Sequence, residues 1–286
     1  MRELDKKNDI VFTPDYIADF MCRLAHVSDE SVVLDNCCGS GALMQAAARA
    51  GAEHIAGVEF EDIPFNMLQE ALGDDARFEY IQGDGLKYNE ILKTAGFNTL
   101  LINPPYSADF GGFIFADKCM REMPDGYAVV LTKTSAQMPQ LLDHSTLLAS
   151  IKMPDILKGY SSVSATIFLF KCGRPHNIDE DFVTFIDMTE DGYKRSGRKS
   201  QKAKHQPGPD SAERYDEVYN IINGNIKESD IKFFKDCYIK DTLKEKTQWT
   251  YDAHRVIDIM PTIDDFRKTV ADYLDWKVSQ ILKGNM

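Results

Sequence analysis

One tetrapeptide, Asn103-Pro104-Pro105-Tyr106, constrains the fold of this chain more than any other stretch. The apolar residues 97–102 predict a buried strand, and the two prolines must end it because they fix φ and cannot donate to a sheet ladder. The asparagine amide therefore lies at the carboxyl end of a strand, where open α/β sheets bind their ligands. An amide oxygen and a nearby carbonyl can accept both hydrogens of an amino group, while a tyrosine ring can stack on a flat base. This set of groups suits holding an amino nitrogen still.

A second unit of strand, turn and helix lies earlier in the chain. Residues 31–35 predict a short buried strand ending in Asp35, and a turn with Gly39 and Gly41 leads into the helix-forming residues 45–50. This arrangement is typical of loops that hold phosphates or nucleosides. It is not the dinucleotide fingerprint, because Met44 occupies the third glycine position, and the carboxylate of Asp35 would repel a pyrophosphate. A ligand with an ammonium group suits that acid better.

Two further acids follow predicted strands. Residues 54–58 end at Glu59, whose carboxylate is placed to accept hydrogen bonds from two ribose hydroxyls. Residues 77–81 precede Asp84, which can accept a hydrogen bond from an adenine amino group. Each acid alone is more often a solvated loop residue. Together with the glycine turn, and without a phosphate-binding lysine, they predict a pocket for a nucleoside with a positive tail, and S-adenosylmethionine fits that description.

The segment Phe12-Thr13-Pro14 predicts the start of an amphipathic helix, with the threonine as N-cap. The order of these motifs resembles that of the amino-methyltransferases that modify adenine in DNA. The order is Phe-Thr-Pro, then the strand-end acid with its glycine turn, then two more acids, and then Asn-Pro-Pro-Tyr. The resemblance is strongest to the modification subunits of type I restriction systems and to the gamma-class adenine methyltransferases, and it covers about residues 8–172. Asn36 is a departure, because the family usually has proline there; it removes no side chain needed for the chemistry.

The resemblance implies an α/β fold, namely a Rossmann-like class I S-adenosylmethionine-dependent methyltransferase with a mostly parallel seven-stranded sheet and helices on both faces. It implies that the Thr-Pro segment closes over the methionine part of the cofactor and that the tetrapeptide holds the adenine amine. The catalytic residues would be Asn103, Pro104, Pro105 and Tyr106. The cofactor-binding residues would be Phe12, Thr13, Pro14, Asp35, Cys37, Gly39, Gly41, Glu59, Asp84 and Asn103. Tyr106 and Tyr160 would stack on the base, although an ordinary surface-turn role for Tyr160 is equally open.

We expect three parts along the chain. Residues 1–190 form the catalytic domain, 191–210 a basic polar linker, and 211–286 a small, mainly helical C-terminal extension that contacts a partner or DNA. The basic run 194–204 lies in the linker. Such a run is usually just solvated, but with DNA as substrate it is the best candidate for a phosphate contact.

The net charge of −12 argues against a chain that grips DNA alone, because a phosphate backbone repels an acidic surface. We therefore expect a separate specificity subunit as partner, beside DNA itself. No apolar run is long enough for a membrane span, and the six cysteines lack the spacing of a metal site. The expectation is a cytoplasmic enzyme with no metal and no membrane contact.

The favoured function is transfer of a methyl group from S-adenosylmethionine to the 6-amino group of adenine in DNA. Protein glutamine methyltransferases of the release-factor type share Asn-Pro-Pro-Tyr, but the Phe-Thr-Pro segment and the lack of their N-terminal helical domain stand against that alternative. An RNA adenine methyltransferase is not excluded by the pocket residues. A catalytically silent cofactor-binding subunit is disfavoured by the intact set of acids and Asn103.

Overall fold

The computed structural model describes residues 12–87, 96–156, 163–196, 204–256 and 263–282. Contacts within the chain divide it into two units, Met1–His254 and Arg255–Met286. The second unit contributes one described element, helix α9 (Ile263–Leu282). None of the helices in these ranges is long and apolar enough to cross a membrane.

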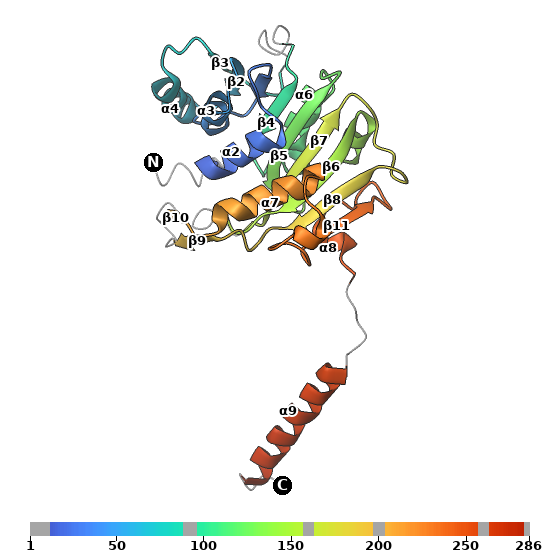
Figure 1. The fold of residues 1–286 in the computed structure, drawn as a ribbon. Coiled ribbons are helices and arrows are strands. Elements are labelled where there is room, and N and C mark those ends of the chain that lie inside the picture. Colours follow the sequence, from blue (N-terminus) through green and yellow to red (C-terminus); the bar gives the residue numbers. More distant parts are fainter. Residues whose placement is uncertain (1–11, 88–95, 157–162, 197–203, 257–262, 283–286) are drawn as a thin grey trace. The chain divides into compact units, whose positions relative to one another are not determined.

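The first unit is built on a single large sheet (Figure 1). In the described ranges it has nine strands, in the order β11-β8-β6-β7-β5-β4-β1-β2-β3. The strands are β1 (Val32–Asp35), β2 (His54–Glu59), β3 (Phe78–Gln82), β4 (Thr99–Ile102), β5 (Gly126–Lys133), β6 (Ser145–Lys152), β7 (Ala165–Cys172), β8 (Phe182–Asp187) and β11 (Tyr238–Thr242). The pairs β1–β2, β1–β4, β2–β3, β4–β5 and β6–β8 are parallel, whereas β7 is antiparallel to both of its neighbours and β11 to β8. The expected mostly parallel α/β sheet is confirmed, with two strands more than the expected seven.

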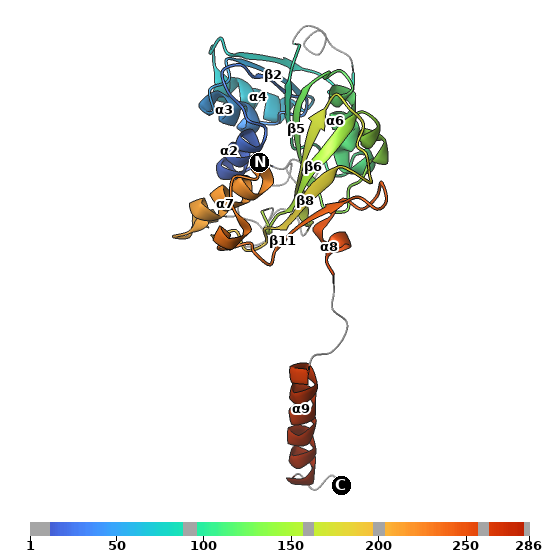
Figure 2. The ribbon, with the colours of Figure 1, turned by 45° about the vertical axis from the view of Figure 1, so that its right-hand side comes forward.

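Helices cover both faces of this sheet, as Figures 1 and 2 show. They are α2 (Asp15–Leu24), α3 (Ala42–Arg49), α4 (Asp62–Leu72), α6 (Phe113–Met120), α7 (Ser211–Asn223) and α8 (Tyr251–His254). The central position of β4 explains why three of its four residues are apolar. Leu101 belongs to the core cluster that also contains α2, α3 and α7 side chains, whereas Leu100 and Ile102 belong to the opposite cluster with Phe113 of α6. Successive side chains of a strand point to opposite faces, so a strand covered on both sides is hydrophobic at every position.

The expected helical C-terminal region is present as α7, α8 and α9, but its part in the first unit also carries a strand. Strand β11 pairs with β8 and extends the sheet, and Trp249 is fully buried against Phe113, Phe168 and Phe170. Burial of so large a ring ties this segment to the core, because aromatic side chains carry much of the hydrophobic stabilisation. The contacts accordingly divide the chain after His254, later than the expected end of the catalytic domain at residue 190.

Part of the expected linker is also ordered as a ribbon. Strands β9 (Tyr193–Ser196) and β10 (Lys204–Pro207) pair antiparallel. Tyr16 of α2 stacks on Tyr193 with ring centroids 3.9 Å apart, and its hydroxyl lies 2.7 Å from His205 Nδ1. The ribbon therefore packs on α2, the helix that follows the Phe-Thr-Pro segment.

Candidate active site

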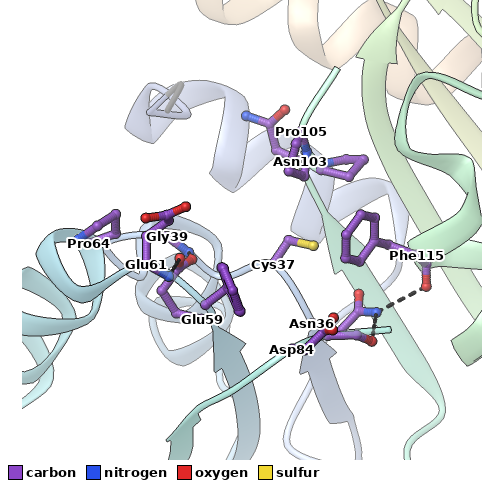
Figure 3. A pocket seen from close by; sticks show the side chains of 13 residues that line it. Asn36, Cys37, Gly39, Glu59, Glu61, Pro64, Asp84, Asn103, Pro105 and Phe115 are labelled. Carbon is purple, nitrogen blue, oxygen red and sulfur yellow. Dashed lines mark hydrogen bonds between the residues drawn. The ribbon is translucent and has the colours of Figure 1, made fainter. Parts of the chain in front are cut away.

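A cavity of about 270 Å³ opens at the carboxyl ends of β1, β2 and β4 (Figure 3). It is lined by Asn36, Cys37, Gly39, Glu59, Phe60, Glu61, Pro64, Asp84, Gly85, Asn103, Pro104, Pro105 and Phe115. These residues come from segments far apart in sequence, and they meet because β4, β1, β2 and β3 are parallel neighbours whose carboxyl ends share one edge. Most of the residues expected to bind the cofactor or the amine therefore lie around one cavity.

A smaller hollow of about 30 Å³ adjoins this cavity, because Cys37, Gly39 and Asn103 line both. Its other lining residues are Phe12, Thr13, Asp35, Cys38, Ser40, Ala42 and Leu43. The Phe-Thr segment thus lies against the glycine turn and the buried Asp35. This is the neighbourhood expected around the methionine part of the cofactor.

Glu59 is held by the backbone of the turns on either side of it. Its Oε2 accepts the N–H of Gly39 at 2.7 Å and its Oε1 accepts the N–H of Glu61 at 2.7 Å. Burial raises the pKa of this carboxyl, and the backbone donors partly offset that shift. A carboxylate oxygen that accepts one backbone hydrogen keeps another lone pair, so both oxygens can still accept a hydroxyl hydrogen from the cavity. This geometry fits a ribose diol.

Asp35 is almost completely buried, with 1% of its surface exposed. Burial, together with a smaller effect of the neighbouring Glu59, raises the pKa of its carboxyl to about 8, against the lowering effect of the Cys37 N–H at 3.1 Å. An ammonium group placed beside it would favour the ionised form and lower that pKa. The site therefore fits a cationic tail.

Asp84 lies in the wall of the larger cavity, whereas Gly41, also expected to bind the cofactor, lines neither hollow. Asp84 Oδ1 accepts the N–H of Leu86 at 2.9 Å, which fixes its carboxylate at the cavity wall. Gly41 has φ +85°, and a Cβ there would lie 2.6 Å from Leu68 Cδ1. Only glycine allows this turn to sit so close to α4. These acceptors and the glycine turn together fit S-adenosylmethionine, with Glu59 toward its ribose and Asp35 toward its ammonium group.

Asn103 contacts the N-terminal segment directly. Its Nδ2 donates to Thr13 Oγ1 at 3.0 Å across 90 residues of sequence. Its Oδ1 is buried and has no donor among the residues that the structure describes. A buried acceptor without a partner costs about 1–3 kcal/mol, so this oxygen is suited to accept a hydrogen from a bound amine. Because Nδ2 is bound to Thr13, the oxygen end of the amide is the end available to a ligand.

The aromatic rings around the site differ from the expected arrangement. Tyr106 is 7% exposed, packs in a core cluster and is absent from the cavity lining, although its motif neighbours Pro104 and Pro105 line the cavity. Tyr160, the other expected stacking residue, lies outside the described residues. Phe60 and Phe115 line the cavity instead. Phe60 directly follows the strand-end acid Glu59, and that position could have identified it as a cavity residue. Nothing in the sequence marks Phe115.

The basic run contributes less to the surface than its sequence suggests. The Arg195 side chain is 7% exposed, and its guanidinium forms an ion pair with Asp191 and donates to the Tyr16 hydroxyl at 2.9 Å. Lys194 and Lys204 are exposed, and 197–203 lie outside the described residues. In the described part of the chain no three His, Cys, Asp or Glu residues are grouped as a metal site.

Comparisons with known proteins agree with this geometry. Residues 2–138 match the family model of N-6 DNA methylases. The type II restriction enzyme and methyltransferase RM.BcgI from Heyndrickxia coagulans is 25% identical over 317 aligned residues, which cover 96% of this chain and 47% of that protein. The chain thus spans about half the length of this curated relative.

Two solved structures share the fold. The modification subunit of a type I restriction enzyme from Vibrio vulnificus has a TM-score of 0.61 at 16% identity, covering 84% of this chain and 57% of that one. The M protein of the type I restriction enzyme EcoKI has a TM-score of 0.59 at 13% identity, covering 77% of this chain and 55% of that one. The family match includes the glycine turn, the strand-end acids and Asn-Pro-Pro-Tyr. Residues 2–138 of this chain are therefore similar to the N-6 DNA methylases, and the larger part of the chain shares the fold of type I modification subunits.

Proposed function

We propose that this protein transfers the methyl group of S-adenosylmethionine to the 6-amino group of adenine in DNA. One observation carries the proposal: the Asn103 amide is oriented by Thr13 and presents a buried acceptor beside a cavity lined by Glu59 and Asp84. An acceptor without a donor, next to this cavity, is what an amino group that receives a methyl group requires. The relatives named above are a restriction enzyme with methyltransferase activity and a modification subunit.

The chain's own groups would act mainly by orientation. When bound, S-adenosylmethionine supplies an electrophilic methyl on a sulfonium. Asn103 Oδ1 and the Pro104 carbonyl would accept the two amine hydrogens and direct the nitrogen lone pair toward that methyl. Fixing the two reactants in this way supplies several kcal/mol of the barrier. The nitrogen releases its proton to solvent after transfer, and a duplex adenine must first leave the base stack at a cost of a few kcal/mol.

We further propose how the rest of the protein is organised. Residues 1–190 would carry catalysis, and residues 211–286 would contact a partner or DNA, with 191–210 between them. The partner would be a separate specificity subunit, because a chain of charge −12 repels the phosphate backbone. The exposed Lys194 and Lys204 are candidate phosphate contacts, whereas the buried pair of Arg195 with Asp191 is not. Such an enzyme would work in the cytoplasm, where its DNA is.

The test is to supply methyl-labelled S-adenosylmethionine to the full chain with unmethylated duplex DNA, with RNA or with protein. Each reaction is run with and without the specificity subunit of the same source. Label in DNA alone supports the proposal. Label in RNA or protein, with none in DNA even when the partner is present, would refute it.

A further inference from the structure

Asn36 occupies the floor of the cavity and is 1% exposed (Figure 3). Its Nδ2 donates to the carbonyl oxygen of Gly85 at 3.2 Å and to that of Phe115 at 3.0 Å. An asparagine amide has two N–H hydrogens, and both are used by these two carbonyls. The carboxamide therefore cannot be turned over, and its oxygen must point away from them.

That oxygen, Asn36 Oδ1, is buried and has no donor within the described part of the chain. In Figure 3 it is directed toward the side of the cavity where Cys37 lies. Leaving such an acceptor unsatisfied is costly, so the residue is poorly suited to a purely structural role. A ligand donor in the cavity would satisfy it.

Asn36 also lies against the segment that carries Asp84. A Cβ on Gly85 would come within 2.0 Å of the Asn36 backbone oxygen, so these two backbones are in close contact. The Asp84 carboxylate lines the same cavity. Two acceptors from different strand ends, one amide and one carboxylate, therefore face one end of the cavity. A ligand group that donates two hydrogens would satisfy both acceptors.

We propose that Asn36 Oδ1 and Asp84 accept the two hydrogens of the 6-amino group on the cofactor's own adenine, so that Asn36 helps to select a 6-aminopurine. The inference rests on the proposed cofactor. A 6-oxopurine presents an oxygen at that position, which leaves Asn36 Oδ1 unpaired and places acceptor against acceptor. Sites built to hydrogen-bond a ligand group reject analogues that lack it. A proline at position 36 would provide no such acceptor from its side chain.

The test compares binding of S-adenosylhomocysteine and S-inosylhomocysteine, its 6-oxo analogue, to the full chain by titration calorimetry. The wild-type chain should prefer the adenine compound, and Asn36→Ala should reduce that preference by about tenfold, the effect of losing one buried hydrogen bond. Asn36→Pro is a second variant if the alanine variant folds poorly. Asn98→Ala is the matched control, because Asn98 likewise donates to a backbone carbonyl, that of Glu30, but does not line the cavity.

The outcomes are separable. A reduced preference in the Asn36 variants, with the Asn98 variant unchanged, supports the inference. Affinities for both compounds that fall equally, with the preference intact, would mean that Asn36 is only structural and overturn it while leaving the cofactor in place. A wild-type chain that binds neither compound would overturn the proposed cofactor and the inference with it.

Discussion

The buried carboxyl of Asp35 predicts an unusual dependence of stability on pH. Its pKa rises from 3.8 to about 8 on folding because it loses contact with water. Between those two values the folded chain binds more protons than the unfolded chain, so the free energy of unfolding falls as pH rises. Each pH unit in this window removes about 1.4 kcal/mol, which amounts to roughly 4 kcal/mol by about pH 7. Asp35→Asn keeps the size and an acceptor for the Cys37 N–H but cannot ionise.

The variant should therefore be more stable than the wild-type chain, by roughly 2 kcal/mol at about pH 5 and roughly 4 kcal/mol at about pH 7. Urea unfolding of both proteins at a series of pH values measures this difference. Asp75→Asn is the control, since Arg77 lowers the pKa of Asp75 to about 2 and its contribution is constant in this range. A difference between the Asp35 variant and wild type that does not grow with pH would refute the reasoning. The same variant should bind S-adenosylmethionine more weakly, because it lacks the carboxylate that we propose faces the ammonium group.

Two further predictions concern the groups around the tetrapeptide. Thr13→Val removes the acceptor for Asn103 Nδ2, so the rate of methyl transfer in a single-turnover assay should fall by about tenfold or more. Thr13→Ser keeps the hydroxyl acceptor and should keep the rate. Equal rates for the valine and serine variants would contradict this prediction. Gly112→Ala adds a Cβ 2.6 Å from Pro104 Cγ at φ +92°, so the melting temperature and transfer rate should both drop. In the control Gly73→Ala, the new Cβ meets nothing within 4 Å and carries only the backbone strain of φ +58°. Equal losses in the two glycine variants would exclude a contact with Pro104 as the cause.

Much of the fold was predictable because its signals are local. The strands that end at Asp35 and Glu59 and the strand before Asn103 are short, mostly apolar runs, and the mostly parallel character of the sheet follows from the resemblance. The grouping of Glu59 and Asp84 around one cavity, with Asp35 in the adjoining hollow, follows from the parallel topology. Helix α2 begins at Asp15, with Pro14 as N-cap and no side-chain capping bond, so the predicted capping role of Thr13 is wrong. The Thr13 hydroxyl instead accepts from Asn103 Nδ2, a contact that no local pattern encodes.

The remaining features depend on contacts between distant segments. Whether Tyr106 faces the cavity or the core depends on what packs above the sheet, and the sequence of the tetrapeptide does not encode that. The five-residue strand β11 carries little periodicity and exists because β8 offers it an edge. The role of Asn36 depends on two carbonyls that lie 49 and 79 residues away. Asn36 stands out in the sequence because the family usually has proline there, but the sequence does not show that Gly85 and Phe115 are its partners.

We infer that Asn103 holds an adenine amine beside bound S-adenosylmethionine. The most direct measurement uses S-adenosylmethionine with a deuterated methyl group, unmethylated duplex DNA and the specificity subunit, followed by mass spectrometry of the nucleosides. The account predicts deuterated N6-methyladenine with the wild-type chain, and a yield lowered at least a hundredfold with Asn103→Ala, although the variant still binds S-adenosylmethionine. Label on cytosine, or an undiminished yield of N6-methyladenine from the Asn103 variant, would contradict it.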